Sequence, residues 1–220
     1  EASKQLLAQE KEFTRMRDQL SQARRDLPWE RVGKAYVFEG PNGKETLADL
    51  FEGRSQLIVQ HFMFDPSWES GCKISSFWAD DFERQVIHLK ARDVTLVAIS
   101  RAPLAKLQAF QQRLGWTFKW VSSLGNDFNY DYDVSYRPED VAQGKAMYNY
   151  APTKFLMSDL PGISVFYRDK DGAIYHTYFC YARGLDMMNA AYHYLDLLPK
   201  GRDEGGRGMA WLRLRDQYGT

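Results

Sequence analysis

The sequence has few of the residues and motifs that mark metal, phosphate or hydrolase sites. Its 220 residues include two cysteines and four histidines. The histidines are scattered, with no His-x-x-x-His or Cys-x-x-Cys spacing, so we expect no metal site. The sequence also has no glycine-rich phosphate loop, serine-hydrolase elbow or paired-carboxylate motif. We therefore expect no cofactor.

The sequence also lacks an excess of either charge, a long apolar run and a secretory signal. Lysine plus arginine equals aspartate plus glutamate at 29 each, so no overall charge attracts nucleic acid or an anionic membrane. No apolar run approaches the ~20 residues that span a bilayer. The first residues are charged and helical rather than a positive region followed by an apolar core. Together with the two cysteines, these features predict a cytoplasmic protein that binds neither nucleic acid nor membrane.

One stretch, Ser55–Phe82, organises the chain. Leu57–Phe64 is a short apolar run typical of a strand buried in a sheet. Residues 65–71 then break the pattern, and helical spacing resumes over Ser76–Lys90. Cys72 therefore lies where a strand hands over to the first turn of a helix. The unpaired amides and the dipole of a helix start favour a thiolate, so we expect a lowered thiol pKa.

A strand, a loop and a cysteine at a helix start form the active-site arrangement of thioredoxin-like proteins. Residues 28–204 resemble the bacterial family called domain of unknown function 899, predicted to be thioredoxin-like dithiol–disulfide oxidoreductases. The resemblance implies an α/β fold, with a central mixed sheet flanked by helices, and a protein or small-molecule thiol or disulfide as substrate. The stretches that carry it are QHFMFDPSWESGC, SFWADDF, HLKARDVTLVAISRAPLAKLQAF, GWTFKWVSS, DFNYDYDVSY, LPGISVFYRDKDG, TYFCYARGLDMMNAAYHYLDLLPKGRDE and a final MAW.

The motif departs from the family pattern at its last position. The family has CxxC, whereas this chain reads Cys72-Lys73-Ile74-Ser75. The resemblance implies Cys72 and Ser75 as the catalytic positions. A serine hydroxyl could donate a hydrogen bond to a thiolate but cannot attack a mixed disulfide. The charge of Lys73 would further favour the thiolate.

Four residues near the motif are expected to contact substrate: Trp68, Lys73, Trp78 and Pro161. For the tryptophans, packing that holds the motif in place is the alternative role. Thioredoxins place a cis-proline immediately before the strand that faces the cysteine. That slot is Ile163 here, so Pro161, two residues earlier, is a loose match whose isomer the sequence leaves open. Arg101, near a strand end, is a candidate partner for an anion.

The N-terminal segment predicts an amphipathic helix over residues 2–25. Its arginines interleave with acidic residues, which favours a solvated face over nucleic-acid binding. The helix should end before Leu27-Pro28 and lie on the domain surface or on a partner subunit, which leaves a homo-oligomer open. We expect residues 1–27 to form this helix and residues 28–220 a thioredoxin-like domain. The apolar positions of the helix are Leu6, Leu7, Phe13, Met16 and Leu20.

The rest of the chain alternates strand and helix signals up to an aromatic, acidic insertion at about 123–158. Either its aromatic residues cover a sheet edge or an oligomer interface, or they form a lid or substrate wall near the thiol. The predicted elements are strands at Tyr36–Phe38, Val94–Ile99, Lys119–Ser122, Ile163–Arg168 and Ala173–Cys180, turns at 40–43 and 169–172, and helices at Glu45–Gly53, Pro103–Leu114 and 184–197.

Three functions are compatible with these features. The first is thiol–disulfide exchange by Cys72 alone, with an external thiol resolving the mixed disulfide. The second is a non-catalytic thioredoxin-fold binding module. A peroxiredoxin-like peroxidase is the third, but its Pro-x-x-x-Thr/Ser-x-x-Cys spacing fails by one residue, because Pro66 lies six and Ser70 two residues before Cys72.

In the thioredoxin topology that the resemblance implies, the second cysteine, Cys180, ends a strand two places from the strand that precedes Cys72. Two strand spacings of about 4.8 Å place the two roughly 10 Å apart, whereas a disulfide needs Cα atoms within about 7 Å. We therefore expect two free cysteines, with Cys72 the faster to alkylate.

Overall fold

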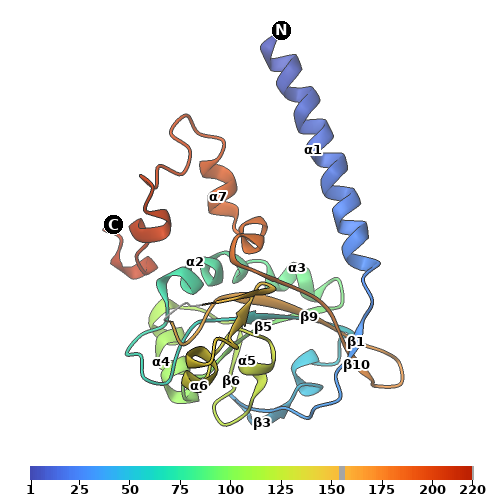
Figure 1. Ribbon diagram of the computed structural model, residues 1–220, viewed down its shortest axis with the longest axis vertical. Helices are drawn as coiled ribbons and strands as arrows, with labels where there is room; N and C mark the ends of the chain where they lie inside the picture. The colour runs from blue at the N-terminus through green and yellow to red at the C-terminus, as the bar shows by residue number, and fades with distance from the viewer. Residues whose placement is uncertain (154–156, 220) are drawn as a thin grey trace.

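A mixed eight-stranded sheet organises the computed structural model, which describes residues 1–153 and 157–219 (Figure 1). The strand order is β1-β10-β9-β4-β5-β6-β2-β3, in which β4, β5 and β6 are parallel and β9 runs antiparallel to β4. The strands are β1 (Glu30–Arg31), β2 (Val37–Gly40), β3 (Gly43–Thr46), β4 (Gln56–His61), β5 (Val94–Ser100), β6 (Lys119–Ser122), β9 (Gly162–Arg168) and β10 (Ile174–Tyr181).

The central strand β4 is buried on both faces, as the apolar run predicts. Leu57 and Val59 enter one core cluster, while Ile58 packs against the clusters on the opposite face. β4 ends at His61, short of the predicted Phe64, because its antiparallel partner β9 begins at Gly162, opposite His61. The chain beyond β4 stays attached to β5, since the Phe62 amide donates to the carbonyl of Ile99 at 3.0 Å.

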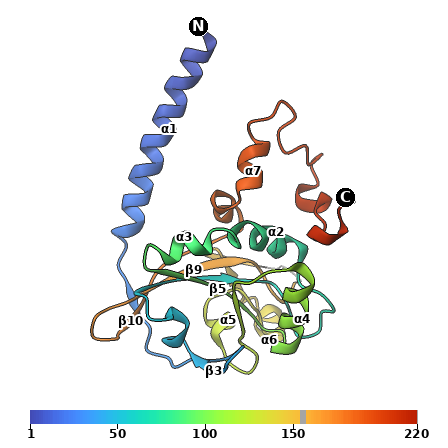
Figure 2. The same ribbon diagram turned by 180° about the vertical axis from the view of Figure 1, so that it is seen from behind.

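Helices cover both faces of the sheet. On one face lie α2 (Lys73–Phe82), α3 (Val86–Lys90) and α4 (Leu104–Leu114), which close a core rich in aromatic rings. The short 3-10 helix η1 (Asp49–Phe51) and α5 (Phe128–Asp131) cover the other face (Figures 1 and 2). The order strand, helix, strand, helix, strand, antiparallel strand pair is the thioredoxin-like fold that the sequence predicts.

The helix predicted over Ser76–Lys90 is two helices. The first, α2, begins earlier, at Lys73, and ends at Phe82. At the break, the Glu83 carboxylate accepts hydrogen bonds from the backbone amides of Thr117 and Phe118 at 3.0 and 3.2 Å. This long-range contact anchors the break, so local periodicity does not reveal it.

Two other predicted helices also differ. Glu45–Gly53 begins inside the β2–β3 hairpin, and its helical part is the short η1. The segment 184–197 divides into the 3-10 helix η2 (Ala182–Met188) and α7 (Ala190–Leu195). The side chain of Asn189 caps α7 by accepting the Tyr192 amide at 3.2 Å, and a capping residue starts a new helix. The predicted hairpin at 169–172 is confirmed.

The aromatic insertion contributes to the core of the sheet. It contains α5, α6 (Pro138–Ala142), β7 (Met147–Tyr148) and β8 (Ala151–Pro152), whereas its residues 154–156 lie outside the described residues. Phe128 on α5 is 0% exposed and joins the cluster around Leu57. This part of the insertion therefore covers a sheet face.

The two ends of the chain lie on the same side of the sheet. The predicted N-terminal helix is α1 (Ala2–Arg25), and none of its residues is buried. It projects from the body instead of lying on the domain surface (Figures 1 and 2). The C-terminal segment ends in η3 (Gly208–Trp211) and η4 (Arg215–Gln217). Within the described chain, no helix combines the length and the apolar character needed to cross a membrane.

Replacing Phe128 tests whether the insertion is part of the core. Phe128→Ala should lower the free energy of unfolding by about 3–5 kcal/mol, because it leaves a cavity where a fully buried ring lay. The matched control is Leu124→Ala in the same insertion, since Leu124 is 44% exposed and should cost less than about 0.5 kcal/mol. Urea unfolding of both variants measures the difference. Equal effects of the two changes would contradict this assignment.

Candidate functional site

Cys72 is the N-cap residue of α2, at the carboxyl end of β4. Its backbone is extended, with φ −64° and ψ 130°. Its amide donates to the carbonyl of Met63 at 3.0 Å, and its own carbonyl accepts the Ser76 amide at 2.9 Å. The thiol is half-buried and free. The structure thus places the cysteine at the strand-to-helix junction that the sequence predicts.

Gly71 allows the loop to pass close to the core before it reaches the cysteine. A Cβ atom at this position would lie 2.7 Å from the Phe110 ring and 2.9 Å from the Phe62 ring. Both rings belong to the core beneath α2 and α4, so neither can move away without disturbing the packing. Glycine is therefore needed here for close approach.

Burial raises the pKa of the Cys72 thiol above its ordinary value. The backbone amides of Ser75 and Ile74 and the charge of Lys73 act in the opposite direction, while Asp159 adds to the rise. Neither amide makes a hydrogen bond of standard geometry to the cysteine side chain. The expected lowering of the pKa is therefore wrong for this site, because loss of solvent outweighs the helix start.

Ser75 connects the start of α2 to the strand. It is 2% exposed, and its hydroxyl oxygen accepts the backbone N–H of Met63 at 3.1 Å. Its carbonyl accepts a hydrogen bond from Gln60 Nε2 at 3.3 Å. Among the described contacts the hydroxyl meets Met63 and not the Cys72 sulfur. Ser75 therefore holds the start of α2 against the end of β4.

Lys73 and Trp68 lie on either side of the cysteine in sequence and make different contacts. The Lys73 ammonium donates to the carbonyl of Ala210 at 3.2 Å, which ties the C-terminal segment to the start of α2. Trp68 is partly buried against the aromatic core, and its carbonyl accepts Lys106 Nζ at 3.0 Å. Trp68 therefore packs against the core, while the charge of Lys73 lowers the pKa of the neighbouring Cys72 thiol.

Trp78 and Pro161 come together behind Ser75, where they line a small cavity of about 10 Å³. Trp78 is 5% exposed, and its Nε1 donates to the carbonyl of Leu185 at 2.8 Å. Pro161 is trans, as no cis peptide bond occurs among the described residues. Its carbonyl accepts the Tyr148 hydroxyl at 2.8 Å. The loose match to a thioredoxin cis-proline is therefore not met.

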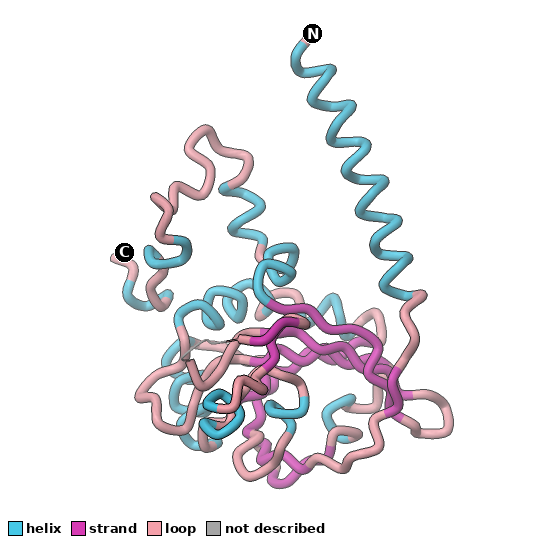
Figure 3. Tube along the Cα trace, viewed as in Figure 1, coloured by secondary structure: helices cyan, strands magenta, loops and turns pink. Residues whose placement is uncertain are grey.

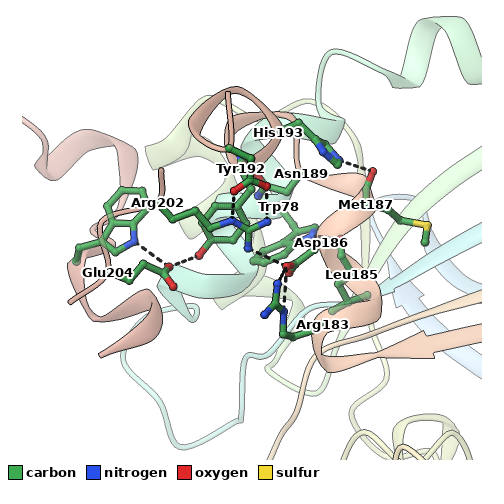
Figure 4. Close-up of polar contacts among 12 residues, drawn as sticks. Trp78, Arg183, Leu185, Asp186, Met187, Asn189, Tyr192, His193, Arg202 and Glu204 are labelled. Carbon is green, nitrogen blue, oxygen red and sulfur yellow. Dashed lines mark hydrogen bonds and ion pairs between the residues drawn. The ribbon is translucent and has the colours of Figure 1, made fainter. Parts of the chain in front are cut away.

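Polar contacts fasten the C-terminal segment beside α2 (Figure 4). Arg202 binds Asp186 and Asp196, each at 2.8 Å, and its guanidinium lies 4.0 Å from the centre of the Tyr192 ring. The Tyr192 hydroxyl donates to Glu204 at 2.8 Å. The segment that receives the Trp78 hydrogen bond is thus held by charge pairs and by an aromatic ring.

Cys180 lies on β10, separated from β4 by β9. It is 8% exposed, and both cysteines are free. Burial also raises the pKa of the Cys180 thiol, and the Tyr178 hydroxyl opposes this rise. The predicted strand order and the prediction of two free cysteines are confirmed. The order in which they alkylate stays a prediction.

A buried charge cluster beside the thiol was not predicted from the sequence. Arg101 pairs with Asp65 and donates from Nε to Asp159 at 2.8 Å. Its Nη1 donates to the Tyr130 hydroxyl at 2.9 Å. Arg101, expected as an anion partner, is therefore already occupied by two carboxylates. Asp65 and Arg101 follow parallel strands, whose carboxyl ends meet at one sheet edge, so their positions were an available signal.

Asp159 links this cluster to the electrostatics of the thiol. It is 2% exposed, and the Ser135 hydroxyl donates to its Oδ1 at 2.7 Å. Burial raises the pKa of Asp159, while Arg101 lowers it. Its Oδ2 has no hydrogen-bond partner among the described residues. Throughout the residues that the structure describes, no group of three or more His, Cys, Asp or Glu residues could hold a metal ion.

Ser75→Ala tests the connection between helix and strand. It should lower the free energy of unfolding by about 1–3 kcal/mol, because the buried Met63 amide loses its acceptor. Ser76→Ala is the matched control. Ser76 is equally buried, but its hydroxyl donates to the Cys72 carbonyl, which the Ser76 amide also reaches. Chemical unfolding should show a smaller loss for Ser76→Ala, and the reverse order would refute this role of Ser75.

Comparison with known proteins identifies the family. Among solved structures, the chain is similar to a PrxQ mutant from Xylella fastidiosa, with 14% identity, TM-score 0.46, and coverage of 72% of this chain and 89% of that chain. It is likewise similar to the mitochondrial 2-Cys peroxiredoxin of Plasmodium falciparum, with 14% identity, TM-score 0.46, and coverage of 76% and 95%. Peroxidoxin BcpB from Mycobacterium tuberculosis shows 13% identity, TM-score 0.47, and coverage of 73% and 95%.

No curated protein matches the chain in sequence. A family model does match it, over residues 1–218, and is described as Bacterial protein of unknown function (DUF899). That span includes the Cys72 motif, the insertion and both terminal segments. The chain therefore belongs to this bacterial family of unknown function.

Proposed function

We propose that this protein is a thioredoxin-like thiol protein that exchanges disulfides through Cys72 alone. The observation that carries the proposal is the position of the thiol, at the N-cap of α2 and the carboxyl end of the central strand. Ligands and reactive groups collect at this edge of open α/β sheets. Ser75 occupies the place of a resolving thiol, so the second attack must come from outside the motif.

The exchange would proceed in two steps. The Cys72 thiol first loses its proton, and the thiolate attacks one sulfur of a disulfide. A new S–S bond forms to Cys72, while the other sulfur leaves as a thiolate and takes up a proton. An external thiolate then attacks the substrate sulfur of the mixed disulfide and releases Cys72. Each cycle consumes one external thiol, which ends in a disulfide with the substrate sulfur, so we propose a cytoplasm that keeps thiols reduced as the setting.

The substrate contacts we propose follow from position. Lys73 is partly exposed next to the thiol and lowers its pKa, so its ammonium is suited to a negatively charged substrate group. We propose Trp68, Trp78 and Pro161 as walls of the substrate site. Trp78 and Pro161 would act from behind Ser75, since both line the small cavity there.

A non-catalytic binding module is the second candidate, and one observation favours it. Burial raises the pKa of Cys72, so most of the thiol is protonated and unreactive at neutral pH. Peroxidase chemistry has less support, because the proline and serine spacing is off by one residue. Moreover, the one arginine of the neighbouring cluster, Arg101, is paired with Asp65 and Asp159.

The reaction with oxidised glutathione separates exchange from binding. We expect a mixed disulfide on Cys72 that forms before any on Cys180 and is released by added thiol. Its rate should keep rising above about pH 8.5, the ordinary thiol pKa, because the pKa of Cys72 is raised and the thiolate fraction grows until pH passes it. Mass mapping of the peptides and the pH profile measure this. Cys180→Ser should react normally and Cys72→Ser should not.

Two results would count against the exchange proposal and for the binding module. The first is Cys72 remaining unmodified well above about pH 8.5, the ordinary thiol pKa, where a thiol of raised pKa also forms thiolate. The second is labelling of Cys180 before Cys72. The same samples treated with iodoacetamide give the alkylation order without a disulfide substrate.

Ser75→Cys should restore the dithiol of the family pattern. Cys72 is the N-cap and position 75 the third residue of α2, and these are the positions that a redox-active CxxC motif joins at a helix start. We expect an intramolecular disulfide under oxidising glutathione and reduction of insulin above the wild-type level. Ser76→Cys is the control, because its side chain lies one position further round α2. If the two thiols of Ser75→Cys stay unlinked, the motif is not poised for redox chemistry.

A further inference from the structure

The N-terminal helix α1 stands clear of the body of the protein (Figure 3). Its 24 residues give a length of about 36 Å, and none of them is buried. Its contact with the sheet is near its end, where Arg24 Nε donates to the Tyr178 hydroxyl at 3.2 Å and lies over that ring. The packing of the described residues therefore leaves nearly all of α1 in solvent.

An apolar stripe runs along this exposed helix at a spacing of seven residues. Leu6, Phe13 and Leu20 are 56%, 63% and 51% exposed, and Leu27, 46% exposed, continues the repeat just after the helix. Met16 follows Phe13 by three residues and is 51% exposed. Apolar positions at a and d of a seven-residue repeat form the seam of a coiled coil.

A helix without tertiary contacts lacks the main source of helical stability in proteins, which is the packing of an apolar face. A stripe of large apolar side chains also marks an interaction surface when it is exposed and contiguous. Both considerations require a partner for the seam. The seven-residue spacing of the seam fits a partner helix with apolar residues at matching intervals.

The charges beside the seam fit a second copy of the same helix in the opposite direction. Glu10 and Arg17 lie one repeat apart on the same side of the seam. Antiparallel pairing about Phe13 and Met16 places Glu10 of one copy opposite Arg17 of the other, and two-fold symmetry repeats the pair. Parallel pairing would instead set Arg17 against Glu12, which already pairs with Arg15 in its own helix.

We propose that α1 pairs with α1 of a second copy as an antiparallel two-stranded coiled coil. In this register, Phe13 packs against Met16 of the other copy and Leu6 against its Ala23. The dimer holds the two thioredoxin-like bodies at opposite ends of the helix pair. Each keeps its own Cys72, so assembly and the thiol chemistry are separate.

Light scattering after size exclusion tests the dimer. The wild type should have twice the 25.6 kDa mass of one chain, and Phe13→Glu should have the mass of one chain. Leu7→Glu is the matched control, because Leu7 is 48% exposed but lies off the seam, and it should stay dimeric. Near-UV circular dichroism should be unchanged in all three, since α1 has no buried residue.

The direction of pairing is tested by disulfide mapping. In a background with Cys72→Ser and Cys180→Ser, the double variant Gln9→Cys with Leu20→Cys should cross-link position 9 of one chain to position 20 of the other. Links of 9 to 9 and 20 to 20 would show parallel helices and overturn the proposal. A monomeric wild type, or a Phe13→Glu variant that stays dimeric, would overturn it as well.

Discussion

The backbone of Met63 is the constraint on which the site depends. Its N–H donates to the Ser75 hydroxyl at 3.1 Å and its carbonyl accepts the Cys72 amide at 3.0 Å. Met63, just past the end of β4, thus binds both ends of the Cys72–Ser75 motif. The loop between Met63 and Cys72 therefore returns to the point where it left the strand. Gly71 passes so close to the rings of Phe62 and Phe110 that no Cβ atom fits at this position. The thiol is fixed where the strand meets the helix.

This fixed position sets two opposing effects on the thiol. The helix start and Lys73 favour the thiolate, but the same close packing removes solvent from the sulfur, and burial prevails. Asp159 adds to the rise, since its carboxylate is buried in the cluster around Arg101. A thiol that is protonated at rest needs a substrate or a higher pH to become a nucleophile. A protein that exchanges disulfides must form this thiolate when substrate binds, whereas a binding module need not form it at all.

The insertion covers one face of the sheet and also contacts the charge cluster around Arg101. Phe128 fills a core on the face opposite α2, which is a covering role. The Tyr130 hydroxyl of the same short helix accepts a hydrogen bond from Arg101 Nη1, near the edge where Cys72 lies. The chain then continues through Asp159 to Pro161, behind Ser75. The insertion therefore has two roles. Phe128 packs in the core, and Tyr130 contacts the charge cluster beside the site.

The sequence by itself determined the features that depend on neighbours along the chain. The apolar run of β4, the hairpin at 169–172 and the cysteine at a helix start follow from periodicity and turn chemistry, and the family resemblance supplied the fold and the strand order. Only the tertiary structure decided the pKa of Cys72, the Met63 partner of Ser75, the occupation of Arg101 and the break at Glu83. Each of these depends on groups far apart in sequence, as Glu83 and Thr117 are. Burial is a property of the packed molecule, so a local pattern that favours a thiolate cannot report the desolvation that opposes it.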